Sequence, residues 1–125
     1  MNEKNENSKN RKFDLEERTA KFGEDVIEFL QKIKVNEINR SLISQLVRSS
    51  TSVGANYEEA DGAVSKKDFK NIIGICKKEA KESKLWLRMM AKANPGKINE
   101  CRILWKEAHE LTLIFSKIIL SCNGK

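Results

Sequence analysis

The side chains that could take part in acid–base or binding chemistry gather between residues 45 and 92. A polar stripe repeats every three or four residues and consists of Gln45, Arg48, Ser52, Asn56 and Glu59. Two carboxylates follow at Glu79 and Glu82. Paired carboxylates can perform acid–base catalysis, but no nucleophile with a base and an orienting group accompanies them. We therefore interpret these residues as a structural polar motif and expect no catalytic residue.

Metal and cofactor chemistry has little support in the sequence. The single histidine, His109, has no further ligand at metal-binding spacing, so we predict a surface or packing role for it. Cys76, Cys101 and Cys122 are widely spaced and form no CxxC pair, which argues against a disulfide framework or a zinc site. Gly-rich phosphate loops and the HExxH and GxSxG motifs are absent. We expect a protein that is not an enzyme and that binds no metal or cofactor.

The basic residues are unevenly distributed along the chain. The formal net charge is +6, and residues 65–92, with nine basic and three acidic side chains, carry the same excess by themselves. On a helix that turns about 100° per residue, one flank collects Lys66, Lys70, Lys77, Lys81, Lys84, Arg88 and Lys92, with Lys67 and Lys78 beside it. This set of nine residues, the basic ridge, is the electrostatic footprint expected for phosphate contact. A solvated face that only increases solubility is the alternative.

The elements that position these residues are all predicted to be helices. The chain has 125 residues, which fits one domain. One proline and six glycines leave few interruptions, and alternating β-branched runs are absent, which favours an all-α fold. We predict a polar, disordered tail over 1–12, a helical domain over 13–122 and a short tail over 123–125.

Apolar residues at helical spacing predict four helices. The first covers about 14–34 from a capping box at Asp14, and the second runs from about 38 to a stop at Gly62. The third begins after an N-cap at Ser65 and stops at 94–96, and the fourth runs from 97–99 to about 122. Short connections make consecutive helices antiparallel, so we predict an up-down-up-down four-helix bundle.

Residues 49–55 carry only short side chains and have poor helix propensity. A loop that interrupts the second helix is one interpretation. We prefer a continuous helix because the apolar spacing keeps its register through the run. Small side chains would then allow a neighbouring helix to approach closely.

The hairpin between the second and third helices, centred near residues 63–64, sets which residues lie level. Positions whose numbers add up to about 127 face each other, so Arg48 is predicted opposite Glu79 and Gln45 opposite Glu82. We predict an Arg48–Glu79 ion pair that is partly buried between helices or subunits. Such a pair fixes register more than it adds net stability.

Apolar side chains outside the core stripes indicate a second buried surface. They are Leu85, Trp86, Met89, Ile103, Leu113, Ile114 and Leu120. An apolar excess on several faces is typical of an interface, so we predict a homo-oligomer, with exposed apolar residues on a monomer as the alternative.

The polar N-terminus lacks a signal-peptide pattern and the apolar stretch 111–120 is too short to span a bilayer, so we expect a cytoplasmic protein.

Three segments carry a resemblance to a known family: RSSTSVGANYEEA at 48–60, SKKDF at 65–69 and KEAKESKLWLR at 78–88. They resemble the four-helix-bundle proteins encoded within intervening sequences of bacterial 23S rRNA genes, also labelled S23 ribosomal proteins. This family is similar to the bacterial accessory variability determinant of diversity-generating retroelements. The resemblance covers about residues 13–120.

The resemblance implies an up-down four-helix bundle assembled as a ring-like homopentamer. For the retroelement relatives it implies binding of nucleic acid and of a reverse transcriptase through a basic surface. Carried over to this chain, the motif residues would be Arg48, Asn56, Glu59, Glu79 and Glu82, and the basic ridge would supply the nucleic-acid surface. We therefore hypothesise an accessory protein that binds structured RNA or RNA–DNA hybrid with little sequence specificity. The alternative is a protein–protein adaptor whose basic ridge engages an acidic protein surface.

Overall fold

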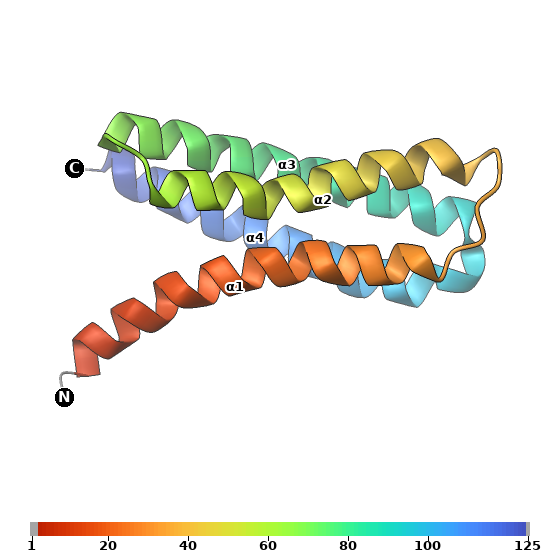
Figure 1. Cartoon of the computed structure of the whole chain (residues 1–125), viewed down its shortest axis with the longest axis horizontal. Helices are drawn as coiled ribbons and strands as arrows, with labels where there is room; N and C mark the ends of the chain where they lie inside the picture. Colours follow the sequence, from red (N-terminus) through yellow and green to blue (C-terminus); the bar gives the residue numbers. More distant parts are fainter. Residues whose placement is uncertain (1–2, 125) are drawn as a thin grey trace.

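The computed structural model describes the backbone of residues 3–124 and the side chains of residues 15–124. Over this range the chain forms four long helices: α1 (Glu3–Gln31), α2 (Asn39–Asp61), α3 (Lys66–Ala93) and α4 (Ile98–Asn123). A short 3₁₀ turn, η1 (Pro95–Lys97), precedes α4. Consecutive helices run in opposite directions (Figure 1), which confirms the predicted all-α, up-down-up-down bundle.

The first helix is longer than the sequence predicts at its beginning. α1 begins at Glu3, so its backbone passes through most of the segment for which a disordered tail is predicted. The physical reason is that no proline or glycine occurs before Gly23, and Lys, Glu and Arg are good helix formers. Because the backbone is helical on both sides of residue 14, the predicted helix start with an N-cap at Asp14 is wrong, since an N-cap residue precedes its helix. The side chains of residues 1–14 lie outside the described part.

The run of short side chains in α2 is helical throughout, as predicted. Ser49 and Ser50 are fully buried. A Cβ atom placed on Gly54 would lie 3.3 Å from the carbonyl oxygen of Thr19 in α1, which is tighter than ordinary van der Waals contact. The predicted close approach is therefore present between α1 and α2, and it depends on the missing side chain of Gly54.

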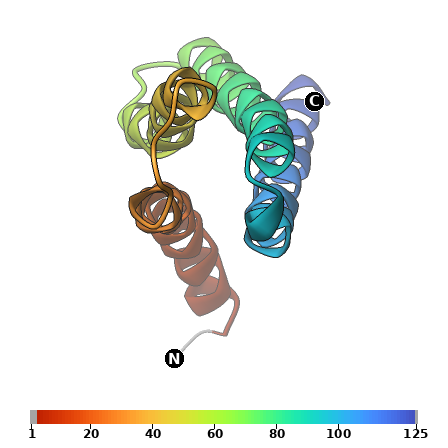
Figure 2. The ribbon, with the colours of Figure 1, turned by 90° about the vertical axis from the view of Figure 1, so that its right-hand side faces the viewer.

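The helices pack in chain order around one core. α2 with α3, and α3 with α4, share the most extensive contacts, whereas α1 packs on α2 and touches α4 only lightly. Viewed end-on, the ribbons therefore form an arc from α1 to α4 (Figure 2). The largest fully buried apolar side chains come from all four helices and are Phe22, Val26, Leu46, Val53, Ile73, Leu87, Met90, Leu111 and Phe115.

A buried asparagine fixes the end of the bundle where two connections meet. Asn39 donates from Nδ2 to the carbonyl of Lys34 at 3.0 Å and to Oδ1 of Asn94 at 3.1 Å. Asn36 accepts from the backbone N–H groups of Ile38 and Asn39 at 2.9 and 2.8 Å, so its side chain satisfies donors at the beginning of α2. These bonds hold the α1–α2 connection against the α3–α4 connection.

The third helix begins as predicted. The hydroxyl of Ser65 accepts from the backbone N–H of Asp68 at 3.1 Å, which is the N-cap arrangement.

None of the helices in the described range has an apolar stretch long enough to cross a lipid bilayer.

Candidate functional site

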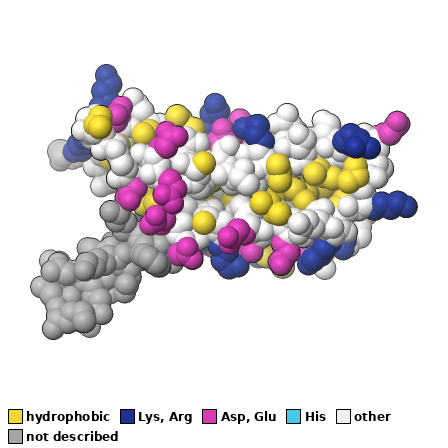
Figure 3. All heavy atoms as spheres, in the orientation of Figure 1, with side chains coloured by type: hydrophobic (Ala, Val, Ile, Leu, Met, Phe, Trp, Pro, Cys, Tyr) yellow, Lys and Arg dark blue, Asp and Glu magenta, His cyan; other side chains and the backbone are white. Residues whose placement is uncertain are grey.

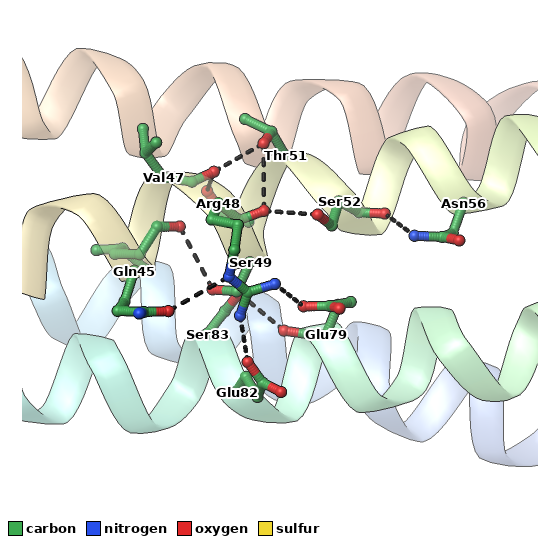
Figure 4. A network of polar contacts seen from close by, with 12 residues as sticks. Gln45, Val47, Arg48, Ser49, Thr51, Ser52, Asn56, Glu79, Glu82 and Ser83 are labelled. Atoms are coloured by element: carbon green, nitrogen blue, oxygen red, sulfur yellow. Dashed lines mark hydrogen bonds and ion pairs between the residues drawn. The ribbon is translucent and has the colours of Figure 1, made fainter.

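Arg48 of α2 joins two carboxylates of α3 (Figure 4). Its Nη1 lies 3.1 Å from Oε1 of Glu79, which confirms the predicted ion pair, and its Nη2 also pairs with Glu82. Glu79 is 8% exposed, whereas the Arg48 side chain is 45% exposed. Burial lowers the pKa of Arg48, but the hydrogen bonds to Glu79 and Glu82 outweigh it and raise the pKa overall. The guanidinium thus bridges solvent and a buried carboxylate.

Two serines continue this polar contact into the core. The hydroxyls of Ser49 and Ser83 lie 2.9 Å apart and are fully buried. Each hydroxyl also lies near a carbonyl of its own helix, Ser83 at 2.9 Å from that of Glu79 and Ser49 at 3.4 Å from that of Leu46. At this level of the bundle, polar side chains therefore extend from the surface into the core between α2 and α3.

The other members of the predicted polar motif lie elsewhere. Gln45 accepts from Nε of Arg48 at 3.3 Å, and Glu82 binds Nη2 of the same guanidinium, so Arg48 joins the two residues that are predicted to lie opposite each other. Ser52 and Asn56 bond along their own helix, to the carbonyls of Arg48 and Ser52. The Glu59 side chain is exposed and makes no hydrogen bond among the described residues.

The basic ridge keeps most of its charge in solvent. Six of its nine members are exposed, namely Lys66, Lys67, Lys78, Lys81, Arg88 and Lys92. Within the described part of the chain, none of the nine forms an ion pair, because Glu79 and Glu82 are both bound to Arg48 on another side of α3. Acidic side chains instead gather over α1 and the neighbouring end of α2, on the face shown in Figure 3. The unpaired basic charge of the ridge thus lies on α3, whereas the acidic charge that gathers on the face in Figure 3 lies on other helices.

Three members of the ridge, Lys70, Lys77 and Lys84, are half-buried. Lys84 is turned toward α4, where its Nζ lies 3.0 Å from Nδ1 of His109 and 5.1 Å from the ring centroid of Trp105. Because an ammonium can only donate, Nδ1 of His109 accepts and the ring is the tautomer protonated at Nε2. The rings of Trp105 and His109 are stacked, with centroids 5.1 Å apart and planes at 14°.

Sequence reasoning missed this Lys84–Trp105–His109 cluster. A surface or packing role is predicted for His109, and its stacking and its bond to Lys84 agree with that role. The available signal was the four-residue spacing of Trp105 and His109, which places both rings on one helix face. Nothing in the sequence indicated that this face of α4 would meet Lys84.

An open groove lies beside the cluster, between the end of α3 and the beginning of α4. Its volume is about 810 Å³. The basic side chains along it are Arg88 and Lys92 of the ridge and Arg102 of α4, and Trp105 forms one of its walls. No carboxylate of the described residues lines it. Arg102 therefore extends the basic surface from α3 onto α4.

A second ion-pair cluster, also missed, joins α1 to α4. Arg18 donates from Nε and Nη2 to the two carboxylate oxygens of Glu107 at 2.8 and 2.9 Å, and from Nη2 to Glu110 at 2.7 Å. The hydrogen bond to Glu107 is the largest cause of a raised pKa of Arg18. This cluster holds α1 against α4 where the two helices otherwise have few contacts.

The cysteines are not arranged for chemistry. Burial raises the pKa of the Cys76 thiol to about 12 and that of Cys101 to about 11, so both are protonated at neutral pH and are poor nucleophiles. All three cysteines are free thiols. Among the described residues, no group of three or more His, Cys, Asp or Glu side chains could hold a metal ion.

Comparison with known proteins agrees with the resemblance seen in the sequence. Residues 11–117 match the family described as 23S rRNA-intervening sequence protein. The structure is similar to the crystal structure of a protein of unknown function from the S23 ribosomal protein family of Bacteroides thetaiotaomicron, with 26% identity and a TM-score of 0.72. That match covers 84% of this chain and 97% of the other. No functionally curated protein matches the chain.

Proposed function

Because this chain belongs to the 23S rRNA-intervening sequence protein family, we propose that it is a non-enzymatic accessory protein that binds structured nucleic acid, either RNA or RNA–DNA hybrid. The family description associates it with rRNA in general terms. The contact would be made to the phosphate backbone by the basic ridge of α3, with Arg102 of α4 as an addition.

The observation that carries this proposal is that six of the nine ridge residues are exposed and that none of the nine forms an ion pair in the described chain. A lysine that is already paired with a carboxylate has little to gain from a phosphate. Of the three acidic residues of α3, Glu79 and Glu82 pair with Arg48, and Asp68 forms no ion pair with the ridge in the described chain. Phosphates would therefore meet uncompensated positive charge, which favours release of counterions on binding.

The proposed binding has a definite physical character. Lysines on a convex helix face contact phosphates, which position a nucleic acid without reading its sequence. Each phosphate contact contributes about −0.9 to the slope of log affinity against log salt concentration on duplex. We therefore expect affinity that falls steeply with salt and differs little between sequences of the same shape.

The test compares two triple variants by RNA affinity across a salt series. One changes exposed ridge residues, Lys81→Glu, Arg88→Glu and Lys92→Glu. The matched control makes the same change in net charge at exposed basic residues away from α3, Lys32→Glu, Arg40→Glu and Lys117→Glu. The ridge variant should lose at least about tenfold more affinity than the control and should show a shallower salt slope. Equal losses would mean that only net charge matters, and no binding by the native protein at low salt would end the proposal.

Self-association is the second part of the proposed function. Ile103, Leu113 and Leu120 of α4 are 69%, 53% and 67% exposed, which is unusual for three large apolar side chains on one helix. They favour burial against another copy, and the family resemblance suggests five copies in a ring. A ring would present several basic ridges to one nucleic acid and would raise its apparent affinity. We also propose that the assembled protein binds a reverse transcriptase or another nucleic-acid enzyme, as the family resemblance implies.

The same exposed apolar residues are what favours the competing candidate, a protein–protein adaptor without nucleic-acid contact. In that case the ridge would bind an acidic protein surface. The salt series separates the two candidates, because an adaptor would show no RNA binding even at low salt.

A further inference from the structure

We propose that the groove between α3 and α4 is a stacking site for an unpaired base of single-stranded nucleic acid, with Trp105 as the stacking surface. This inference rests on the proposed nucleic-acid function and deepens it, because it names the part of the nucleic acid that the protein contacts. Unpaired loops and ends of a structured RNA would be the preferred segments.

The charge of the groove selects an anionic ligand. Arg88, Lys92 and Arg102 border it, and no carboxylate of the described chain lies along its walls. Between these cations the lining is apolar and includes Leu87, Ala91 and Cys101. A nucleotide has the matching combination, since its phosphates are charged and its base has two apolar faces. The groove is large enough for such a group, at about 810 Å³.

Trp105 is held in place before any ligand arrives. His109 stacks on one face of the indole at a centroid distance of 5.1 Å, and Lys84 lies 5.1 Å from the indole centroid while bonded to His109. His109 lies one turn after Trp105 along α4, whereas Arg102 and Ile98 of the groove lie one and two turns before it. Trp105 itself lines the groove, so the indole borders the groove while His109 and Lys84 hold it in place.

An exposed and fixed indole suits base stacking. Trp105 is 37% exposed, so a base can reach it without unfolding any part of the bundle. Stacking of a base on an aromatic ring tolerates every base but requires that the base is unpaired, because bases in a duplex already stack on each other. Lys84 adds positive charge beside the indole–imidazole pair. The site should therefore distinguish single strands from duplexes and not one sequence from another.

Fluorescence can report on Trp105 alone. The other tryptophan, Trp86, has a buried indole N–H without a hydrogen-bond partner among the described residues, so Trp86→Phe removes no hydrogen bond. In this background the probes are a single-stranded RNA of about ten nucleotides, an abasic strand with the same number of phosphates, and an RNA duplex. We expect the base-bearing strand to quench Trp105 fluorescence and to bind about tenfold more tightly than the abasic strand, as stacking of one base implies.

Variants at position 105 complete the test. Trp105→Leu should remove the preference for the base-bearing strand and leave abasic affinity unchanged, and Trp105→Phe should restore most of it. Val64→Ala, at a 90% exposed position outside the helices that does not line the groove, is the matched control and should change neither affinity. Circular dichroism checks that each variant is folded.

The failures are distinguishable. If Trp105→Leu reduces the affinity of both strands equally, or of neither, the stacking site does not exist while the proposed function stands. If the native chain binds neither strand, the proposed function itself fails. Quenching by a polyglutamate peptide but not by the base-bearing strand would overturn the stacking site in favour of an acidic protein partner.

Discussion

Arg48 and Glu79 are 31 residues apart in the chain, yet their side chains meet at 3.1 Å across the α2–α3 contact. Glu79 is buried, and Arg48 is the cation that compensates its charge (Figure 4). The pair therefore ties the register of two helices to a carboxylate that is costly to bury alone. Replacing either Arg48 or Glu79 should lower the free energy of unfolding, and the size of the loss should depend on whether the other residue of the pair is still present.

The charge-reversed variant Glu79→Lys should lower the free energy of unfolding by about 2–4 kcal/mol, because it places a second cation beside Arg48 in a poorly solvated position. Adding Arg48→Glu should restore only part of the loss, since the carboxylate introduced at position 48 would face Glu82 as well as the new ammonium group. Urea unfolding of both single variants and the double variant gives the coupling energy. Strictly additive effects would show that the two side chains do not interact.

Two glycines in helix interiors should respond to alanine in opposite ways. Gly54→Ala brings a Cβ to 3.3 Å from the carbonyl of Thr19 and should lower stability by about 1 kcal/mol, despite the better helix propensity of alanine. Gly74→Ala in α3 is the matched control, because no described atom beyond its own helix backbone lies within 4 Å of the added Cβ. It should raise stability by up to about 1 kcal/mol. Chemical denaturation measures both, and stabilisation by Gly54→Ala would mean that α1 and α2 are not in close contact.

The buried thiols should make the fold sensitive to alkali. Burial raises the pKa of Cys76 from 9.0 to about 12 and that of Cys101 from 9.0 to about 11, so the folded state favours the neutral thiol. The unfolded chain loses these protons first, so their contribution to stability is complete below about pH 9 and is lost as the pH rises toward about 11–12. Between about pH 8 and 10.5 we expect a loss of about 1–2 kcal/mol per thiol.

The control for this pH effect is the double variant Cys76→Ala and Cys101→Ala. It should be less stable than the native chain at neutral pH, because removal of buried sulfur leaves small cavities. Its stability should nevertheless fall less over the same alkaline range, since the two proteins differ only in the two thiols. Parallel stability curves would contradict the assignment to the thiols.

The exposed apolar residues of α4 should control self-association. Leu113→Ser and Leu120→Ser change side chains that are 53% and 67% exposed in the single chain, so they should leave the helical content unchanged. If these residues are buried between copies, the double variant should sediment as a smaller species than the native protein. Val64→Ser, at a 90% exposed position outside the helices, is the matched control. Equal sedimentation of all three proteins would exclude this face of α4 as the interface.

Much of the α2–α3 half could be predicted from the sequence because its determinants are local. The N-cap at Ser65 involves residues three apart, and the short connection at 62–65 forces the two helices to lie antiparallel and sets their register. Arg48 therefore had to lie near Glu79 once both segments were helical. Only the reach of the guanidinium to Glu82 was missed, because it depends on the side-chain conformation.

The other contacts were decided by the tertiary structure. Arg18 and Glu107 are 89 residues apart, and Lys84 and His109 face each other only because of how α3 and α4 are rotated about their axes. Helical spacing shows which residues share a face but not which neighbour that face meets. The sequence by itself determined four helices, their order and the basic ridge. Packing of the whole core determined that α1 is held to α4 through Arg18 and that Trp105 is fixed beside a cationic groove, because the rotation of each helix is set by all of its buried side chains together.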